Sequence, residues 1–212
     1  KHQLLNLVQN CESKHLPEAV ALLASNIFQT GSSWSEFNTF MQTNLKPGST
    51  YSVPAVEVYI HLPVYLAKEF SDLESLLHLL LSSQNPSTRL LALKAMKLFF
   101  RAQESLNSQS LIQSAITSVD FILTKSQYEG QSALKVLTEI SENTPRMFEP
   151  HLSDITEPVN HIFANYEPSD QNLVLEFSVS VVEGVLSKEL AGFVAQKTLE
   201  LMVALDKEIT DD

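Results

Sequence analysis

The side chains able to do chemistry in this sequence are mainly histidines and carboxylates. The six histidines are His2, His15, His61, His78, His151 and His161. They form no H-x-x-x-H pair and no H-E-x-x-H motif, and a single cysteine, Cys11, cannot build a zinc site. The sequence also contains no glycine-rich phosphate loop, nucleophile elbow or kinase motif. We therefore expect a protein that is not an enzyme and that uses no cofactor and no metal.

The carboxylates recur at the spacing of helical stripes. One stripe comprises Gln131, Lys135, Glu139 and Glu142, and the next comprises Glu176, Ser180, Glu183 and Ser187. If these helices stack in register, Glu139, Glu142, Glu176 and Glu183 form one acidic surface. An exposed ion pair contributes only about 0.2–1 kcal/mol, so this surface suits an extended basic partner that makes many contacts. A merely solvated face is the alternative for any single residue.

Basic residues form a shorter stripe earlier in the chain. Lys94, Lys97 and Arg101 share one face of a predicted helix and are further candidates for partner contacts. Arg89 lies at the start of the same helix, just after the Asn85-Pro86 turn. Its position favours a structural role, in which it bonds to a neighbouring turn, over contact with a ligand.

These side chains must be positioned by helices, because apolar residues recur at i, i+3, i+4 and i+7 almost throughout. Capping boxes are predicted at Ser33–Glu36 and Ser71–Glu74, and Pro17 and Pro86 stand where helices can begin. Pro63 and Pro158 should each kink or end a helix. The predicted helices span residues 2–12, 16–29, 34–45, 52–67, 72–83, 87–102, 108–125, 129–143, 148–164, 170–186 and 189–206.

The short turns between these helices recur at intervals near 40 residues, as from Pro47 to Pro86. Two helices per interval indicate stacked helical hairpins, which bury their apolar faces against the preceding and following pair. We predict an all-α, right-handed α-solenoid of about five antiparallel helix pairs over residues 1–212, cut from a longer chain. An irregular all-helical globule is the alternative.

Composition narrows the choice of partners. The formal charge is −11, with 14 Lys and Arg against 25 Asp and Glu, and no basic cluster could follow a phosphate backbone. Nucleic-acid binding is therefore not expected, whereas basic protein partners suit the charge. No apolar run approaches the length of a membrane span, and one unpaired cysteine fits a reducing compartment.

Three stretches resemble a known family. The segment ALKVLTEISENTPRMFEPHL, residues 133–152, resembles the amino-terminal HEAT repeats of importin-beta (karyopherin-beta) nuclear transport receptors. The following segment, LVLEFSVSVVEGVLSKELAGFVAQKTLELMVALDKE, resembles the next repeat. The stretches SSWSEF and LLSSQNPSTRLLALKAMKLF resemble earlier repeats, in which a tryptophan opens a first helix. The branch that imports ribosomal proteins and histones is the most similar.

The resemblance implies a protein-binding segment of a receptor that shuttles between cytoplasm and nucleus through the nuclear pore. In such receptors the first helix of each pair lies on the convex side and the second on the concave side. Basic cargo and RanGTP bind the concave side, and phenylalanine-glycine (FG) nucleoporins bind grooves between convex helices. Apolar residues of the first helices are expected to be mostly core, with one or two of them lining such a groove; they are Phe37, Phe40, Phe121, Phe148, Ile162 and Phe163. A HEAT-repeat scaffold of another kind, such as a phosphatase scaffold or coat adaptor, is the alternative.

Overall fold

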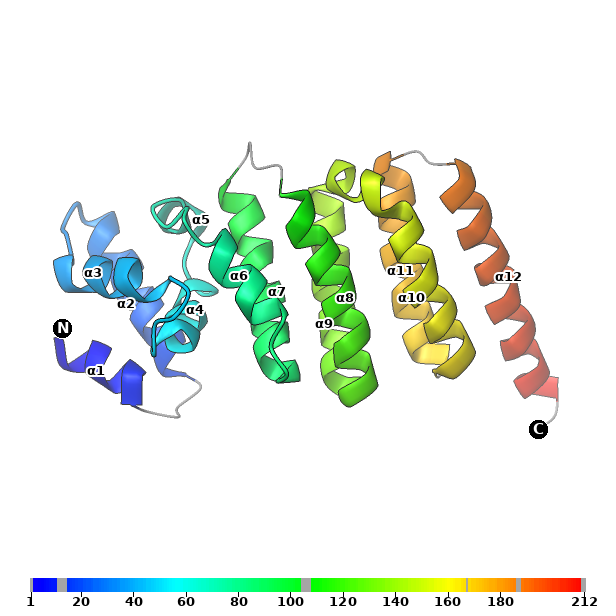
Figure 1. Cartoon of the computed structure of the whole chain (residues 1–212), viewed down its shortest axis with the longest axis horizontal. Coiled ribbons are helices and arrows are strands. Elements are labelled where there is room, and N and C mark those ends of the chain that lie inside the picture. The colour runs from blue at the N-terminus through cyan, green and yellow to red at the C-terminus, as the bar shows by residue number, and fades with distance from the viewer. Residues whose placement is uncertain (1, 11–14, 104–107, 167, 186–187, 211–212) are drawn as a thin grey trace. The chain divides into compact units, whose positions relative to one another are not determined.

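The computed structural model describes residues 2–10, 15–103, 108–166, 168–185 and 188–210. Every regular element among them is a helix, so the all-α prediction is confirmed (Figure 1). The chain divides into two compact units, residues 1–106 and 107–212, and each is described by itself. The expectation of a single solenoid segment over residues 1–212, and of its right-handed course, stays a prediction.

Unit 1 holds seven helices in its described residues, and the amphipathic pattern places nearly all of them. Pro17 and Pro86 both stand in the first turn of a helix, where a missing backbone N–H leaves no bond unmade. The bounds are α1 (His2–Asn10), α2 (Leu16–Gln29), α3 (Ser35–Asn44), α4 (Ser52–Tyr59), α5 (Val64–Ala67), α6 (Glu74–Leu81) and α7 (Pro86–Ala102).

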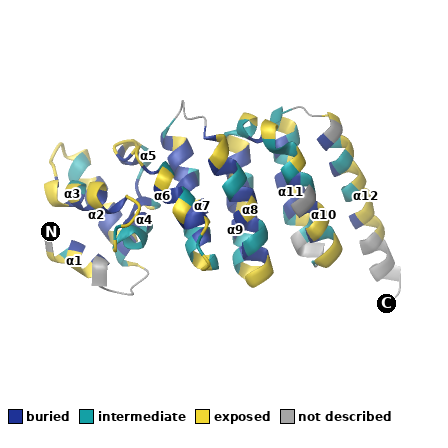
Figure 2. Ribbon diagram, viewed as in Figure 1, coloured by how far each residue is buried: buried dark blue, intermediate teal, exposed yellow. Residues whose placement is uncertain are grey.

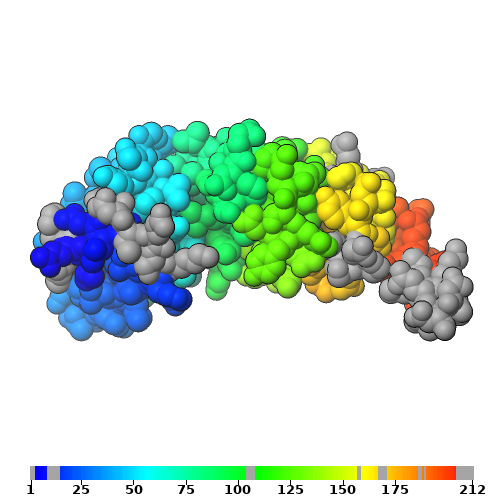
Figure 3. Space-filling view, turned by 90° about the horizontal axis from the view of Figure 1, so that it is seen from below, coloured from blue at the N-terminus to red at the C-terminus, as the bar shows by residue number. Residues whose placement is uncertain are grey.

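Unit 2 holds longer helices, and its described elements follow one another in chain order in the space-filling view (Figure 3). Ser126 caps α9, because its hydroxyl accepts a hydrogen bond from the Glu129 N–H at 3.4 Å. The bounds are α8 (Gln109–Lys125), α9 (Gln127–Asn143), the 3₁₀ helix η1 (Pro145–His151), α10 (Leu152–Asn165), α11 (Pro168–Val185) and α12 (Lys188–Thr210).

The same packing rule operates inside each unit. Helices pair as α1 with α2, α3 with α4, α6 with α7, α8 with α9, and α10 with α11. The first helices of neighbouring pairs contact each other, as in α1 with α3 and α8 with α10. The second helices do the same, as in α2 with α4, α4 with α7, and α9 with α11. Stacked helical hairpins of this kind make an α-solenoid.

The core lies between the helices, where the buried residues gather (Figure 2). Trp34 is fully buried at the start of α3 and stacks on Phe37, with 5.3 Å between ring centroids. In unit 2, Phe148 of η1 meets Phe177 of α11 edge to face at 5.7 Å. Phe40 and Ile162 are also buried, whereas Phe121 and Phe163 are half-buried.

Two local predictions were wrong, the continuous helix over residues 52–67 and the two capping boxes. The helix predicted over residues 52–67 ends at Tyr59 and restarts as α5 after Pro63, whose backbone is extended with ψ 151°. Proline has no N–H to continue the helical ladder, so the chain turns here. The prediction that Pro63 interrupts a helix is thereby confirmed. Pro158 does not end α10, which runs through it, and a kink at this residue stays a prediction. Neither capping box forms. Helix α3 begins one residue later than predicted, at Ser35, and α6 begins two residues later, at Glu74, and neither has a side-chain cap.

Candidate protein-binding surface

The second helices of three successive pairs begin at a constant interval. Helices α7, α9 and α11 start at Pro86, Gln127 and Pro168, which are 41 residues apart in each case. Because the interval is constant, equivalent positions on these helices are related by the same step along the sequence. In unit 2, α9 and α11 pack directly on each other, so their polar stripes are neighbours.

The acidic stripes of α9 and α11 are exposed. Glu139, Glu142, Glu176 and Glu183 all have exposed side chains. They stand opposite the faces that pack into the core, which on α9 include Leu134, Leu137 and Ile140. The period of 3.6 residues that buries one face therefore presents these carboxylates to solvent.

Three of the four glutamates line one groove. Glu142, Glu176 and Glu183 surround a groove of about 530 Å³ between α9, η1 and α11. Its other lining residues are Thr138, Pro145, Val179, Ser180 and Gly184. Glu139 is exposed on α9 but does not line the groove.

The floor of this groove depends on a close approach of α11 to η1. A Cβ atom at Gly184 would overlap the Pro145 ring, so only glycine allows this spacing. Across α9 and α11, the Ser141 and Ser180 hydroxyls are hydrogen-bonded to each other. Together these contacts hold Pro145, Val179 and the three carboxylates around one hollow.

The groove has two features that suit a cationic side chain: carboxylates and apolar atoms. Carboxylates attract an ammonium or guanidinium group, and Arg pairs with carboxylates in a bidentate geometry. The apolar atoms of Val179 and Pro145 suit the methylene stem that a Lys or Arg side chain carries beneath its charge. Glu176 also accepts a hydrogen bond from the Asn172 amide at 3.1 Å, which orients one carboxylate.

The basic candidates lie in unit 1. Lys94 and Arg101 of α7 are exposed and Lys97 is half-buried. Arg89, at the start of the same helix, is only 8% exposed, and its Nε donates to the Ser83 carbonyl at 2.5 Å. It thus reaches back to the turn that precedes its own helix, which is the geometry a structural role requires.

Sequence reasoning missed the apolar part of the groove. Thr138, Pro145, Val179 and Gly184 have no chemical signature in the sequence, and periodicity places residues on one helix without showing which helix faces it. The only signal is Gly184 itself, a glycine inside a helix pattern, where it usually marks a close packing contact.

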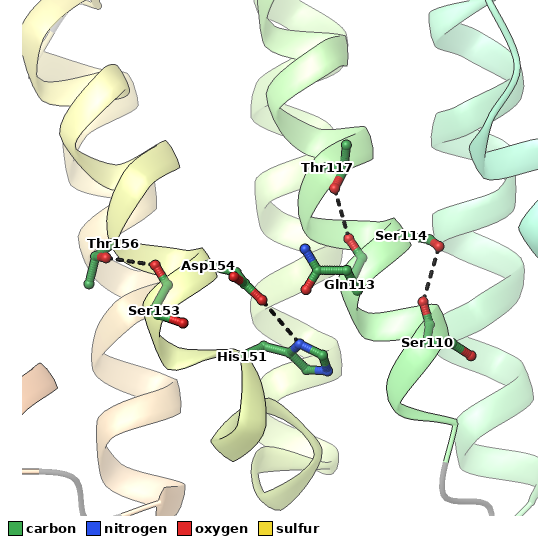
Figure 4. A network of polar contacts seen from close by, with 8 residues as sticks. All are labelled: Ser110, Gln113, Ser114, Thr117, His151, Ser153, Asp154 and Thr156. Carbon is green, nitrogen blue, oxygen red and sulfur yellow. Dashed lines mark hydrogen bonds and ion pairs between the residues drawn. The ribbon is translucent and has the colours of Figure 1, made fainter.

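The polar groups on the first-helix side of unit 2 do not converge on a site. Figure 4 shows that the Ser114, Thr117 and Thr156 hydroxyls each bond a carbonyl of their own helix, at 3.0, 3.0 and 2.7 Å. His151 Nδ1 lies 3.2 Å from Asp154. Its Nε2 is buried without a hydrogen-bond partner among the described residues, so no nucleophile contacts this pair there.

The described part of the chain lacks two features that would bear on function. No group of three or more His, Cys, Asp or Glu residues in that part is arranged to hold a metal ion. No described helix combines the length and the apolar character that crossing a membrane requires.

A groove with apolar walls also separates two first helices in unit 1. It measures about 380 Å³ and lies between α1, which contributes Leu5, and α3, which contributes Thr39, Phe40 and Thr43. Phe40 is one of the predicted groove residues. Of the others, Phe37, Phe148 and Ile162 are buried in the core.

Comparison with known families shows to which family the chain belongs. Residues 12–158 match the family model described as IPO5-like, TPR repeats. The chain belongs to this family. The match confirms the resemblance to importin-beta-type receptors, and the importin-like helical-repeat family is generally non-enzymatic. The IPO5-like region includes Glu139 and Glu142, whereas Glu176 and Glu183 lie beyond it. No curated protein and no solved structure matches the chain.

Proposed function

We propose that this chain is a protein-binding segment of a nuclear import receptor that carries basic cargo through the nuclear pore and releases it when RanGTP binds. Such a receptor shuttles between the cytoplasm and the nucleus. The observation that supports the proposal is the groove between α9 and α11, in which the carboxylates of Glu142, Glu176 and Glu183 lie beside apolar atoms of Pro145 and Val179. Membership of the IPO5-like family supports the transport role.

The small free energy of exposed ion pairs decides what kind of cargo fits the groove. Three exposed ion pairs contribute about 0.6–3 kcal/mol together, which is far less than a specific complex needs. The groove is therefore one contact point for an extended basic segment, which places one Lys or Arg side chain here and others along neighbouring second helices. Glu139, just outside the groove, extends the acidic surface along α9.

The other two partners of such a receptor have different chemistry. FG nucleoporins present phenylalanine side chains, which suit the apolar groove between α1 and α3 that Phe40 lines. RanGTP binds the second-helix side of importin-beta-type receptors near their amino end, and we propose the same side here.

A binding measurement tests the cargo site. We expect Glu142→Gln, Glu176→Gln and Glu183→Gln together to weaken binding of a labelled Lys- and Arg-rich peptide by about 3- to 150-fold, the range set by three exposed ion pairs. Glu139→Gln alone should have a smaller effect, because this residue lies outside the groove. Fluorescence anisotropy of the labelled peptide gives the dissociation constants.

A matched control separates the groove from overall charge. Glu18, Glu69 and Glu149 are also exposed, and changing all three to Gln removes the same three charges. Equal weakening by both triple variants, or none by the groove variant, would contradict the proposed cargo site. RanGTP and FG-repeat pull-downs test the rest of the proposal. Failure of both would favour the scaffold alternative.

A further inference from the structure

The net charge of the chain lies in one unit only. Residues 1–106 contain 8 Lys and Arg and 8 Asp and Glu, whereas residues 107–212 contain 6 and 17. Unit 1 is therefore neutral, and unit 2 carries the whole charge of −11. A basic cargo accounts for the charge of unit 2 but not for the exposed cations of unit 1.

Two of the exposed cations of unit 1, Lys94 and Arg101, lie on α7. This helix has no acidic residue and four basic ones. Arg89 is turned toward the Ser83 carbonyl, while Lys94, Lys97 and Arg101 follow at the i, i+3, i+7 spacing of a single face. Lys94 and Arg101 are exposed, and neither has an ion-pair partner among the described residues.

The helices packed on α7 form no described ion pair with Lys94 or Arg101. The carboxylates of α4 and α6 are Glu57 and Glu74, both half-buried, and no described ion pair joins either to Lys94 or Arg101. The histidines His61 and His78 adjoin or belong to the same two helices. The face is thus basic in a chain whose surface is otherwise acidic.

We propose that the α7 face, defined by Lys94, Lys97 and Arg101, binds an extended acidic peptide segment rich in Asp or Glu. This partner is distinct from basic cargo, and the proposal does not rest on the cargo site in unit 2. Charge complementarity selects the partner, since a basic stripe repels basic cargo and attracts carboxylates. Arg101 supplies the planar, bidentate contact, and the two lysines supply point charges.

The spacing along α7 also sets the spacing in the partner. At 1.5 Å per residue, Lys97 and Arg101 are about 6 Å apart along the axis, and Lys94 and Arg101 are about 10 Å apart. An extended peptide rises about 3.3 Å per residue, so alternate residues lie about 6.6 Å apart and project to one side. An acidic residue at every second position therefore matches the step from Lys97 to Arg101.

A peptide of alternating Asp and Ser, labelled with fluorescein, tests the assignment against the whole chain by anisotropy. We expect Lys94→Glu with Arg101→Glu to weaken binding by at least about fivefold, because two attractions become repulsions. Lys94→Gln with Arg101→Gln should weaken it by less. Circular dichroism establishes that the variants fold, as expected for exposed positions.

The matched control is Lys46→Glu with Lys125→Glu, which changes two exposed lysines away from α7 and gives the same net charge. We expect it to alter binding less than twofold. Three outcomes would overturn the proposal: no binding by the unaltered chain, equal loss in both charge-reversed variants, or tighter binding of a single-stranded oligonucleotide than of the acidic peptide. The basic peptide is measured on the same proteins. If the unaltered chain binds only the acidic peptide, the cargo site fails and the α7 site stands.

Discussion

At two single residues, Arg89 and Glu57, burial clearly disfavours the charged form of the side chain. Burial lowers the pKa of the Arg89 guanidinium and raises the pKa of the Glu57 carboxyl, and in the latter case the nearby His61 partly opposes the rise. The two differ in what offsets the loss of hydration. Arg89 has the Ser83 carbonyl at 2.5 Å, whereas Glu57 has mainly the charge of His61.

Replacing Arg89 by Met tests the structural role predicted for this arginine. Met keeps much of the apolar stem but removes the donor to the Ser83 carbonyl. We expect a loss of about 1–2 kcal/mol in the free energy of unfolding, because the half-buried Ser83 carbonyl loses a charged donor. Chemical denaturation measures it, and Arg101→Met, at an exposed position of the same helix, should change the free energy by less than about 0.5 kcal/mol. Equal effects of the two variants would rule out the structural role.

The raised pKa of Glu57 should make the stability of the folded chain depend on pH. Since its folded-state pKa is raised, the folded chain binds the proton more tightly than the unfolded chain. Its contribution to stability is therefore lost as pH rises from the ordinary value of 4.5 through the folded-state pKa. We expect Glu57→Gln to raise the melting temperature at pH 7 and to have a smaller effect at pH 4. Melting curves at both pH values check this, and the exposed Glu69→Gln should show no such difference.

Sequence reasoning found the charged residues of the candidate surface but not their surroundings. The spacing of Glu142, Glu176 and Glu183 was enough to place them on polar helix faces. It could not show that Glu139 lies outside the groove, because the lining depends on how α9, η1 and α11 pack. Contacts between helices have no period in the sequence, so residues such as Val179 were not found.

At the scale of elements, two glycines show how a helix can be fitted to its neighbour. Gly130 of α9 meets Leu123 of α8, and Gly184 of α11 meets Pro145 of η1, so closely that neither position has room for a Cβ. Each glycine weakens its own helix by about 0.5–1 kcal/mol relative to alanine. The close approach of two elements explains why this cost is tolerated.

Alanine at Gly184 and at Gly192 should have opposite effects. Both glycines lie in helices, but no atom comes within 4 Å of a Cβ built at Gly192. We expect Gly192→Ala to stabilise the chain by about 0.5–1 kcal/mol through helix propensity. Gly184→Ala should destabilise it by about 1–3 kcal/mol, because α11 must move away from η1. Chemical denaturation of both variants gives the comparison, and a stabilising Gly184→Ala would contradict the close packing.

Element boundaries were predictable where the apolar period is long, and less so where it is interrupted. Helices α8, α9 and α11 end within about two residues of their predicted limits. The helix over residues 52–67 was predicted as continuous because the helical pattern persists across the turn, although Pro63 marked the place where α5 begins. The two capping boxes failed although their motifs are present, since the packing of Trp34 and Leu73 into the core starts each helix later.

At the scale of the whole chain, the uneven distribution of charge should govern its response to salt. The 17 carboxylates and 6 cations of residues 107–212 repel one another on balance, whereas residues 1–106 are balanced. Salt screens exposed charges over a distance of about 10 Å at 0.1 M and about 3 Å at 1 M.

We therefore expect the melting temperature to rise when salt is added, because screening relieves repulsion in unit 2. Glu139→Gln with Glu142→Gln should reduce the rise, since these neighbours on α9 remove two of the repelling charges. Melting curves recorded across a salt series measure the effect. A Lys94→Gln, Arg101→Gln variant serves as the control and should not reduce it. A melting temperature that falls with salt would contradict this account.

The constant step between the starts of α7, α9 and α11 has a consequence for how such a chain can change in length. A deletion or duplication of 41 consecutive residues beginning at Gln127 would join one hairpin to another whose helix begins in the same register. Each junction would keep its apolar side inward, since inside each unit the described pairs pack on the pairs beside them. The polypeptide can thus be lengthened or shortened by whole modules, and any ligand that spans several of them would gain or lose contacts in equal increments.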